Sequence, residues 1–457
     1  MMEIAGKKVV VVGFGKTGQA LAGFLVRRKA KVTVSEIRRK EEFGAKIRKW
    51  REKGVSFETG KHGARTFLAA DLIIPSPGAA ALPELAAAEK AGARVLSELE
   101  LASRFLKGKI VGITGTNGKS TTATLAHKIL KEAGRTAYLA GNIGTPLISF
   151  VDKSRDGHIY VTEISSFQLE HIDRFKADIS VFLNISLNHL DWHSSFDEYL
   201  SAKKRIVLAQ AADDLAILNA DDRLVSGLAG EILPKVHFFS RRAEVDRGCF
   251  LRDGWIILRD EAGEQKLMKT AEIRLPGRHN QENVMAAALI GKALGVTPRS
   301  MRASIRSFPG LEHRLEKVLT LDGVSFINDS KATTVEATVK ALQSFDRRIV
   351  LILGGRDKGA DFRLLRREVR QSVKKIVLLG EARAKIAAAL RGLVPMVEAL
   401  SLREAVRLAH AAAGRGEVVL LAPACTSFDM FKNFGARGRA FKREARKLAE
   451  SVRRGEA

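Results

Sequence analysis

The sequence predicts an α/β protein built from three domains, each with a mainly parallel β-sheet. The chain has 457 residues, more than one ordinary hydrophobic core accommodates. Short apolar runs of strand length alternate with helix-like stretches along most of it, which is typical of parallel sheets covered by helices. This alternation restarts twice, so we expect domains at residues 1–99, 100–309 and 310–457.

The composition is that of a soluble globular protein, since 46% of the residues are hydrophobic and 28% are charged. The early apolar run "VVVVGFG" is too short to span a bilayer or to act as a targeting segment. The two cysteines, Cys249 and Cys425, are far apart and in no metal-binding spacing. We therefore expect a cytoplasmic protein with reduced thiols and no membrane insertion.

The net charge of +26 raises the question of a polyanionic partner. The basic residues are spread over predicted helix faces, as in "RLLRREVRQSVKK", without a basic tail or the interleaved aromatic residues of RNA-binding proteins. We favour a solvated basic surface that steers anionic substrates towards the protein, and we expect no nucleic-acid partner.

The first segment has the pattern of a Rossmann-like domain. Val9 to Val12 read as a buried strand, Gly13-Phe-Gly-Lys-Thr-Gly18 as a G-x-G-x-x-G turn, and Gln19 to Arg28 as a helix. Glu36 closes the next predicted strand, where dinucleotide-binding proteins carry an acidic ribose ligand. Taken alone, the motif predicts a nicotinamide-dependent oxidoreductase, although such a turn binds any pyrophosphate. Glycines that only permit tight strand-to-helix packing are the structural alternative.

The second segment opens with a phosphate-binding loop, "GITGTNGKSTT", at residues 112–122. It departs from the usual G-x-x-x-x-G-K-[ST] because Ile113 stands at the position of the first glycine. Lys119 would neutralise the β- and γ-phosphates of a nucleotide, and Ser120 would offer its hydroxyl to Mg²⁺. The stretch predicts a P-loop mononucleotide-binding central domain, with a purely structural glycine turn as the alternative. A polar, hairpin-like insertion is expected at 249–267.

Two side chains later in this segment are candidates for a metal site. Glu163 follows the strand-like "HIYVT" and His189 follows "ISVFL", and ligands collect at the carboxyl edge of parallel sheets. A solvated carboxylate and a hydrogen-bonded structural histidine are the alternatives, and Asp191 and His193 compete with His189 on one loop. Lys203 lies in "EYLSAKKRIVLAQ", which by composition reads as a solvated basic helix face.

The third segment follows a linker at Pro309 and Gly310 and again alternates strands with helices, which predicts a second Rossmann-like domain. Its stretch "NDSKATT", residues 328–334, comes after the strand "VSFI" and concentrates polar groups where a ligand loop is expected. An N-cap of the next helix by Asp329 or Ser330 is the structural alternative.

Three motifs occur in one order along the chain: "TGTNGKST", then "EISSFQLE", then "GLEHRLE" with "INDSKATT". This combination resembles the Mur ligase family over nearly the whole sequence. The resemblance implies ATP-dependent amide formation, in which a substrate carboxylate attacks the γ-phosphorus and an amine captures the acyl phosphate. The N-terminal "GFGKTG" and the C-terminal "PACTSFDMFKNFGARG" are similar to the branch that adds D-glutamate to UDP-N-acetylmuramoyl-L-alanine in peptidoglycan precursor synthesis.

The resemblance implies a role for each position that matches a motif of the family. The catalytic residues would be Lys119, Glu163, His189 and Lys203. ATP would be bound by Gly115, Thr116, Asn117, Gly118, Lys119, Ser120, Thr121, Asn280, Arg314, Asp329 and Lys331. The UDP substrate would contact Gly15, Lys16, Thr17, Arg38, Gly78 and Asn142, and D-glutamate would contact Lys358, Ser427 and Phe434. Mg²⁺, expected as two ions, would be held by Ser120, Glu163, His189 and Lys203, the last as a carbamate formed with carbon dioxide.

The sequence departs from the family's pattern at three places. The stretch 35–39 has Glu36 and Ile37 where Asp-Thr-Arg is commoner, which affects the expected uracil contacts. Thr334 replaces a commoner asparagine. Arg356 stands where a small or acidic residue is more usual, and its extra charge would alter amino-acid selectivity.

The sequence leaves four alternatives open: a Mur-type ligase with a different amino-acid selectivity, the nicotinamide oxidoreductase, a nucleic-acid-stimulated ATPase and a folylpolyglutamate synthase. The last shares the ATP chemistry, but its resemblance should not extend through the first predicted domain. We expect the first domain to bind the UDP substrate, the second ATP and the third the amino acid, in a monomer.

Overall fold

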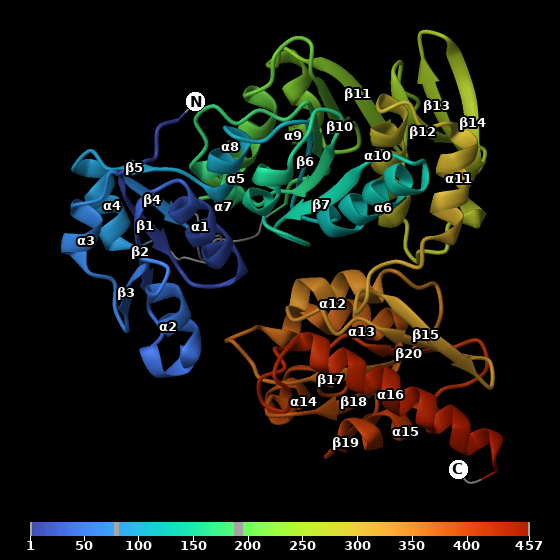
Figure 1. Ribbon diagram of the computed structural model, residues 1–457. Coiled ribbons are helices and arrows are strands. Elements are labelled where there is room, and N and C mark those ends of the chain that lie inside the picture. Colours follow the sequence, from blue (N-terminus) through green and yellow to red (C-terminus); the bar gives the residue numbers. More distant parts are fainter. Residues whose placement is uncertain (1, 77–81, 187–194, 456–457) are drawn as a thin grey trace. The chain divides into compact units, whose positions relative to one another are not determined.

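The computed structural model describes residues 2–76, 82–186 and 195–455. It contains two compact units, one formed by Met1–Glu272 with Gln281–Arg306 and the other by Ile273–Asn280 with Ser307–Ala457. The described residues form three β-sheets, of five, nine and six strands (Figure 1). The predicted α/β class with mainly parallel sheets is confirmed, whereas the domain boundaries at 99 and 309 stay predictions. No helix in these ranges is long and apolar enough to cross a bilayer.

The first sheet has the strand order β3-β2-β1-β4-β5, and its pairings are parallel. Its strands are β1 (Lys8–Val12), β2 (Lys31–Glu36), β3 (Ser56–Thr59), β4 (Leu72–Pro75) and β5 (Arg94–Val95). The accompanying helices are α1 (Lys16–Arg27), η1 (Lys40–Phe43), α2 (Ala45–Arg51), α3 (Ala64–Leu68), α4 (Pro83–Lys90) and α5 (Glu98–Ser103). Alternate side chains of β1 pack against α1 on one face and against α3 and α4 on the other, so both faces are buried, as in Rossmann-like sheets.

Helix α1 begins earlier than the sequence pattern predicts. The pattern places its start at Gln19, but Gly15 is the N-cap and Lys16 is the first helical residue. Gly18 is therefore inside the helix, where a Cβ atom would lie 2.0 Å from the carbonyl oxygen of Gly13. The third glycine of the motif thus permits close packing of the helix on the turn.

The second sheet has the order β14-β13-β12-β11-β10-β9-β6-β8-β7. Its parallel strands are β6 (Lys109–Thr114), β7 (Ala137–Gly141), β8 (Ile159–Glu163), β9 (Ile179–Phe182), β10 (Leu215–Asn219), β11 (Lys235–Ser240) and β12 (Gly248–Arg252). The insertion predicted at 249–267 extends this sheet in antiparallel fashion through β13 (Trp255–Asp260) and β14 (Gly263–Lys269). The helices are α6 (Lys119–Glu132), η2 (Leu147–Lys153), α7 (Ser166–Glu170), α8 (Phe196–Leu208), α9 (Arg223–Ser226), η3 (Gly227–Gly230), η4 (Thr270–Glu272), α10 (His279–Ala293) and α11 (Pro298–Ser307).

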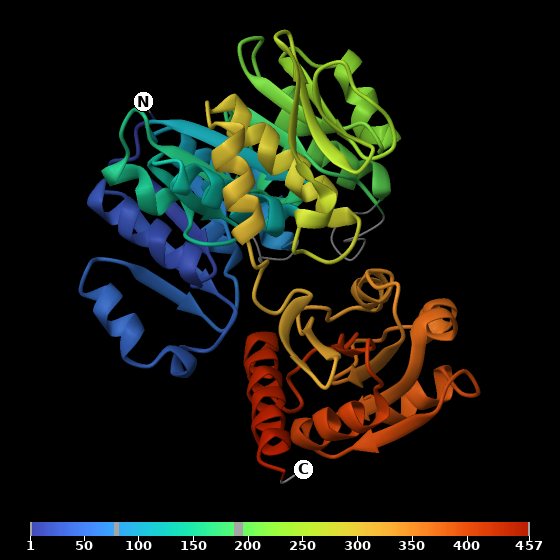
Figure 2. The same cartoon turned by 90° about the vertical axis from the view of Figure 1, so that its right-hand side faces the viewer.

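The third sheet has the order β15-β16-β20-β17-β18-β19, and its β15–β16 pair is antiparallel. Its strands are β15 (Glu316–Leu321), β16 (Val324–Asn328), β17 (Ile349–Gly354), β18 (Val373–Leu379), β19 (Met396–Ala399) and β20 (Val418–Leu421). The helices are α12 (Val335–Leu342), η5 (Phe362–Leu365), α13 (Arg366–Ser372), α14 (Arg383–Ala389), α15 (Leu402–Ala412) and α16 (Phe434–Arg453). Helices α12, α13 and α14 pack on one face of the sheet, and α15 and α16 pack on the other (Figure 2).

The N-cap of α12 is not the residue that the structural alternative for the "NDSKATT" stretch predicts. Neither Asp329 nor Ser330 is the N-cap, because the helix begins at Val335 and Thr334 caps it. The Thr334 hydroxyl accepts a hydrogen bond from the Ala337 N–H at 3.3 Å. Threonine and asparagine both cap helices in this way, so the departure from the family's pattern keeps that role.

Candidate active site

The phosphate loop connects β6 to α6 at the carboxyl edge of the second sheet. Strand β6 continues to Thr114, so Ile113 is still part of the sheet, where it is fully buried and pairs with Glu163 of β8. A glycine at 113 is therefore not required, since the turn begins only after the strand ends. Its positive-φ positions are Gly115 (142°) and Gly118 (86°). The predicted ATP-binding residues in this loop and the first turn of α6 are Gly115, Thr116, Asn117, Gly118, Lys119, Ser120 and Thr121.

Helix α10 contacts this loop through Asn283. A Cβ atom on Gly118 would lie 2.2 Å from Asn283 Oδ1, and the same oxygen accepts a hydrogen bond from the Thr122 hydroxyl at 3.3 Å. A side chain at position 118 would therefore require Asn283 to move. The loop is thereby held against α10 and leads into the N-terminus of α6, where backbone N–H groups and the helix dipole favour a phosphate.

Two lysine side chains converge on the carbonyl groups of the loop. Lys119 Nζ donates to the carbonyl oxygens of Gly115 and Thr116 at 2.8 and 3.1 Å. Lys203 Nζ, from α8, donates to the Gly115 oxygen at 3.1 Å and to the Thr114 hydroxyl at 3.4 Å. The interpretation of Lys203 as part of a solvated helix face is wrong, because this residue is only 2% exposed.

The surroundings of Lys203 favour its neutral amine. Burial lowers the pKa of Lys203 well below its ordinary value, the charge of Lys119 lowers it further, and Glu163 opposes both. The centre of the Tyr199 ring lies 4.8 Å from Lys203 Nζ, and the Tyr199 hydroxyl is 3.1 Å from that of Thr116. An amine must be unprotonated to add to carbon dioxide, so this environment suits the predicted carbamate.

Glu163 ends β8 beside the phosphate loop, and it is buried. Asn142 Nδ2 donates to Glu163 Oε1 at 3.2 Å, while Oε2 is buried and has no hydrogen-bond partner among the described residues. A buried, unpaired carboxylate oxygen is costly unless a cation or a donor binds it. Mg²⁺ takes oxygen ligands of this kind, so Glu163 fits the predicted metal role. The alternative of a solvated carboxylate is wrong.

Two predicted residues, His189 and Gly78, lie outside the described residues, as do Asp191 and His193. Ser120, another predicted metal ligand, is buried in the first turn of α6. Within the described ranges, no three His, Cys, Asp or Glu side chains are grouped to hold a metal ion. The composition of the metal site therefore stays a prediction.

In the first sheet, the carboxylate of Glu36 already accepts hydrogen bonds from other residues of the protein. Its Oε2 accepts hydrogen bonds from the Phe14 N–H at 2.8 Å and from the Arg38 guanidinium at 2.9 Å. Burial raises the pKa of Glu36, but the bonds from Arg38 and Phe14 outweigh this effect and hold the pKa below its usual value. The oxidoreductase alternative thereby loses its acidic ribose ligand. The predicted UDP contacts at the N-cap and first turn of α1 are Gly15, Lys16 and Thr17.

In the second unit, Asp329 follows β16 and is buried. Its Oδ1 accepts from the Leu315 N–H at 3.3 Å. Burial raises the pKa of Asp329 to about 6, although the charge of Arg314 opposes the rise. Arg314 Nε is buried without a hydrogen-bond partner in the described part of the chain, so its N–H is a candidate donor to a nucleotide oxygen. Asn280 Nδ2 donates to the Pro276 carbonyl at 2.6 Å.

The predicted D-glutamate residues come from three segments of the second unit. Lys358 is exposed after β17, Ser427 is buried after β20, and Phe434 begins α16. The Lys331 ammonium lies 5.9 Å from the centre of the Phe434 ring. A residue predicted to contact ATP and one predicted to contact the amino acid are therefore neighbours.

Arg356 does not bring an uncompensated charge to this region. Its guanidinium makes two hydrogen bonds to the Glu381 carboxylate, at 2.8 and 2.9 Å. This exposed bidentate ion pair offsets the extra charge of Arg356, and its effect on amino-acid selectivity stays a prediction.

Arg437 is a residue that the motif analysis did not single out. It is 2% exposed and donates to the hydroxyl and carbonyl of Ser330 and to the carbonyls of Cys425 and Thr426. It thereby ties the 328–334 loop to the loop after β20. The signal in the sequence is weak, because α16 carries many arginines and only the flanking glycines of "FGARG" distinguish this one.

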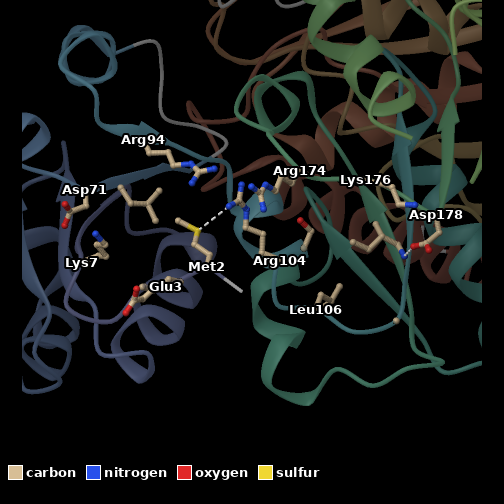
Figure 3. Close-up of a pocket in the computed structure, with 15 residues that line it drawn as sticks. Met2, Glu3, Lys7, Asp71, Arg94, Arg104, Leu106, Arg174, Lys176 and Asp178 are labelled. Carbon is tan, nitrogen blue, oxygen red and sulfur yellow. Dashed lines mark hydrogen bonds between the residues drawn. The ribbon is translucent and has the colours of Figure 1, made fainter. Parts of the chain in front are cut away.

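A separate pocket of about 830 Å³ opens at the amino ends of the strands (Figure 3). Its lining residues that immediately precede β1, β4, β6 and β9 are Lys7, Asp71, Gly108 and Asp178. Arg94 and Arg104 both pair with Asp173, and Lys176 pairs with Asp214, so much of the positive charge here is neutralised. None of the predicted site residues lines this pocket, which separates it from the site at the carboxyl edge.

The sequence matches three domains of one protein family. Residues 7–97 match the N-terminal domain of MurD-like Mur ligases, residues 113–291 match the Mur ligase middle domain, and residues 313–425 match the Mur ligase glutamate ligase domain. The chain belongs to the Mur ligase family, whose members are ATP-dependent amide-bond ligases. The match through residue 97 argues against the folylpolyglutamate synthase alternative.

Two curated relatives are UDP-N-acetylmuramoylalanine–D-glutamate ligases. That of Koribacter versatilis is 46% identical over 454 residues, which are 99% of this chain and 100% of the relative. That of Acidobacterium capsulatum is 48% identical over 444 residues, which are 96% of each. Two solved structures share the fold at a TM-score of 0.59 and cover 97% of this chain and 100% of their own: a pseudomurein peptide ligase type C from Methanothermus fervidus (19% identical) and a UDP-N-acetylmuramate-alanine ligase from Thermotoga maritima (18% identical).

Proposed function

We propose that the protein joins D-glutamate to UDP-N-acetylmuramoyl-L-alanine at the expense of ATP, giving ADP, phosphate and a precursor of peptidoglycan. The observation that carries the proposal is the near full-length similarity to ligases of this name, at 46% and 48% identity. The one departure expected to alter amino-acid selectivity, Arg356, has its charge offset by Glu381. We further infer a cytoplasmic monomer without a nucleic-acid partner.

The first step is the activation of the substrate carboxylate. One of its oxygens attacks the γ-phosphorus of ATP while the bond to the β–γ bridging oxygen breaks, which leaves ADP and an acyl phosphate. Such a transfer needs mainly positioning and charge neutralisation. Lys119 supplies a positive charge once its ammonium exchanges the carbonyls of Gly115 and Thr116 for phosphate oxygens, and the N-terminus of α6 adds backbone donors.

Ser120 and Glu163 are the described residues that would hold Mg²⁺, with His189 as the further ligand that the family's pattern implies. Bound Mg²⁺ would neutralise charge on the phosphates. Asn142 orients the Glu163 carboxylate through Oε1 and leaves Oε2 for the ion. Lys203 would act as a carbamate: its neutral amine would add to the carbon of carbon dioxide and lose a proton, so that a neutral side chain becomes an anionic ligand.

The second step is the capture of the acyl phosphate. The amine of D-glutamate attacks the acyl carbon, inorganic phosphate leaves, and the amide bond forms. Lys358 and the Ser427 hydroxyl would bind the carboxylates of D-glutamate, and Phe434 would flank it. Arg437 supports this arrangement, because it fixes the loops that precede Lys331 and Ser427.

The decisive experiment incubates the purified protein with ATP, Mg²⁺ and UDP-N-acetylmuramoyl-L-alanine and measures phosphate release with and without D-glutamate. We expect release to depend on D-glutamate, and a panel of L-glutamate, D-aspartate, L-lysine and meso-diaminopimelate to give little. Equal release with another amino acid would redirect the assignment within the family. Phosphate release stimulated by DNA or RNA but not by any amino acid would contradict the proposal.

A further inference from the structure

The loop that follows β9 runs beside the phosphate loop and is bonded to it by Asn184. The Asn117 N–H donates to Asn184 Oδ1 at 2.9 Å, and Asn184 Nδ2 donates back to the Asn117 carbonyl at 3.2 Å. The backbone carbonyl of Asn184 accepts from the Thr116 N–H at 2.9 Å. The side-chain amide of Asn184 thus pairs with the backbone of Asn117 as one peptide group pairs with another in a sheet.

A second set of bonds joins the same two segments through Thr116 and Ser186. The Ser186 N–H donates to the Thr116 hydroxyl at 3.0 Å, and that hydroxyl lies 3.3 Å from the Ser186 carbonyl. Residues 116 and 117 are therefore bonded along their length to residues 184 to 186. This arrangement holds the first half of the phosphate loop in one conformation.

These bonds divide the backbone donors of the loop into two groups. The N–H groups of Thr116 and Asn117 point to Asn184, so they are not available to a phosphate. Helix α6 begins at Lys119, and the N–H groups in the first turn of a helix, which have no acceptor inside the helix itself, are suited to bind a phosphate. Asn184 consequently decides which part of the loop the nucleotide meets.

The segment that carries Asn184 is itself anchored from the neighbouring strand. Asn219 Nδ2, at the end of β10, donates to the Leu183 carbonyl at 2.8 Å, and the Ile185 N–H donates to the Asp222 carboxylate at 2.8 Å. The residues on both sides of Asn184 are held, so its amide is presented to the phosphate loop in one orientation. Preorganisation of this kind reduces the ordering that binding otherwise requires.

We infer that Asn184 is a positioning residue for ATP: its side-chain amide holds residues 116 and 117 in the shape that presents the N-terminus of α6 to the phosphates. The inference rests on the proposed function in that ATP is the ligand of this loop. It predicts an effect on nucleotide affinity that is separate from general stability, because the hydrogen bonds of the Asn184 side chain go to Asn117 of the phosphate loop.

The test compares Asn184→Ala and Asn184→Asp with Asn219→Ala. The last removes a bond to the same segment, at Leu183, without touching the phosphate loop, and so serves as the matched control. Binding of ATP with Mg²⁺ is measured by titration calorimetry without the other substrates, and kcat and KM are measured for ATP and for the UDP substrate. Melting temperatures report on stability.

We expect Asn184→Ala to weaken ATP binding by roughly 10- to 100-fold, the effect of two lost hydrogen bonds, with the KM of the UDP substrate within about twofold of wild type. Asn184→Asp keeps the acceptor for the Asn117 N–H but places an oxygen against the Asn117 carbonyl, so it should weaken ATP binding at pH 8 and recover part of it as the new carboxyl is protonated. Asn219→Ala leaves the Asn184 amide in place and only loosens the segment that carries it, so it should weaken ATP binding by no more than about fivefold, even where its melting temperature falls as far as that of the other variants.

Unchanged ATP affinity in Asn184→Asp, or an equal loss of affinity in Asn219→Ala, would overturn the inference. If Asn184→Ala does not fold, the comparison rests on Asn184→Asp, which keeps the shape of the side chain. The D-glutamate dependence of the wild-type protein tests the proposed function on its own, so a failure of that function is distinguishable from a failure of this positioning role.

Discussion

The side-chain nitrogens of Lys119 and Lys203 donate to the same acceptor, the carbonyl oxygen of Gly115, at 2.8 and 3.1 Å. Two lysines so placed cannot both keep their protons without mutual repulsion. Lys203 is the more deeply buried of the two, and its pKa is lowered by burial and by the charge of Lys119. The phosphate loop therefore has one lysine suited to bind phosphate and another suited to react as an amine.

The first prediction is that Lys203→Met abolishes ligase activity and raises the stability of the protein at neutral pH. In carbon dioxide-free buffer the folded protein holds Lys203 with a lowered pKa, so the unfolded chain binds more protons and the free energy of unfolding of wild type rises with pH towards the ordinary lysine pKa. Methionine removes the free-energy cost of burying the lysine amine. We therefore expect the free energy of unfolding to rise by about 1 to 4 kcal/mol at pH 7, and this difference should shrink as the pH approaches 10. Urea unfolding over pH 6 to 10 measures it.

Lys204→Met is the matched control for this prediction. Lys204 is the next residue of α8, is only partly buried and pairs with Glu231 at 3.6 Å. Its replacement should change the free energy of unfolding by no more than about 0.5 kcal/mol, without the pH trend, and should leave activity in place. A pH trend shared by both variants would contradict the assignment of a neutral amine to Lys203.

The second prediction concerns metal affinity. Glu163→Gln should raise the Mg²⁺ concentration needed for half-maximal activity by more than about 100-fold, and Asn142→Ala, which removes the group that orients Glu163 Oε1, by about 10- to 100-fold. The melting temperature of Glu163→Gln without metal should not fall, because Oε2 has no bond within the described residues to lose. A lower melting temperature with an unchanged Mg²⁺ requirement would mean that Glu163 is structural.

The sequence predicts most of the fold because its signals are local. Apolar runs of strand length and glycine turns indicate β1, β6 and their following helices, and the predicted sheets are present. The start of α1 is predicted three residues too late, since Gly18 looks like a turn residue and is instead required by contact with Gly13. That contact depends on how the helix docks, which no local pattern records.

The sequence predicts the site only where its residues form a motif of consecutive positions. The phosphate loop is such a motif, and the absence of a glycine at position 113 is explained by the length of β6. Lys203 is not part of such a motif, because "AKKR" is typical of an exposed helix face. Its burial follows from the packing of α8. The hydrogen-bond partner of the Asn184 side chain is 67 positions away in the sequence, and the partners of Arg437 are at least 11 positions away. These contacts form only when the strands and helices have assembled, so no local pattern predicts them. The pairing of Arg356 with Glu381 is hidden for the same reason.

The third prediction separates crowding at the phosphate loop from backbone strain. Gly118→Ala places a methyl group 2.2 Å from Asn283 Oδ1 at a positive φ, whereas Gly134→Ala, at the other end of α6, has a positive φ of 77° and nothing within 4 Å. Gly134→Ala should cost about 1 to 2 kcal/mol of stability and leave ATP affinity unchanged. Gly118→Ala should cost more and weaken ATP binding at least about tenfold, as calorimetry and urea unfolding will show. Equal effects of the two variants would mean that Asn283 yields and that only strain matters.

The last prediction follows from the buried carboxylate of Asp329. Its pKa is raised from 3.8 to about 6, so between these values the folded protein binds more protons than the unfolded chain, and the free energy of unfolding falls as the pH rises through this window. At about 1.4 kcal/mol for each pKa unit, the penalty above pH 6 is of the order of 3 kcal/mol. Asp329→Asn keeps the acceptor for the Leu315 N–H and removes the charge, although Arg314 then lacks its neighbouring carboxylate.

We therefore expect Asp329→Asn to be more stable than wild type at pH 8, by about 1 to 3 kcal/mol, and equal to it near pH 4, while ATP binding is weakened because Asp329 is a predicted nucleotide contact. Asp346→Asn, an exposed aspartate of the same unit, provides the control and should show neither effect. Urea unfolding at pH 4, 6 and 8 follows the stability difference. A difference that grows towards low pH would have the wrong sign for a carboxyl group with a raised pKa, and it would show that Asp329 is held in the folded protein as a stabilised anion.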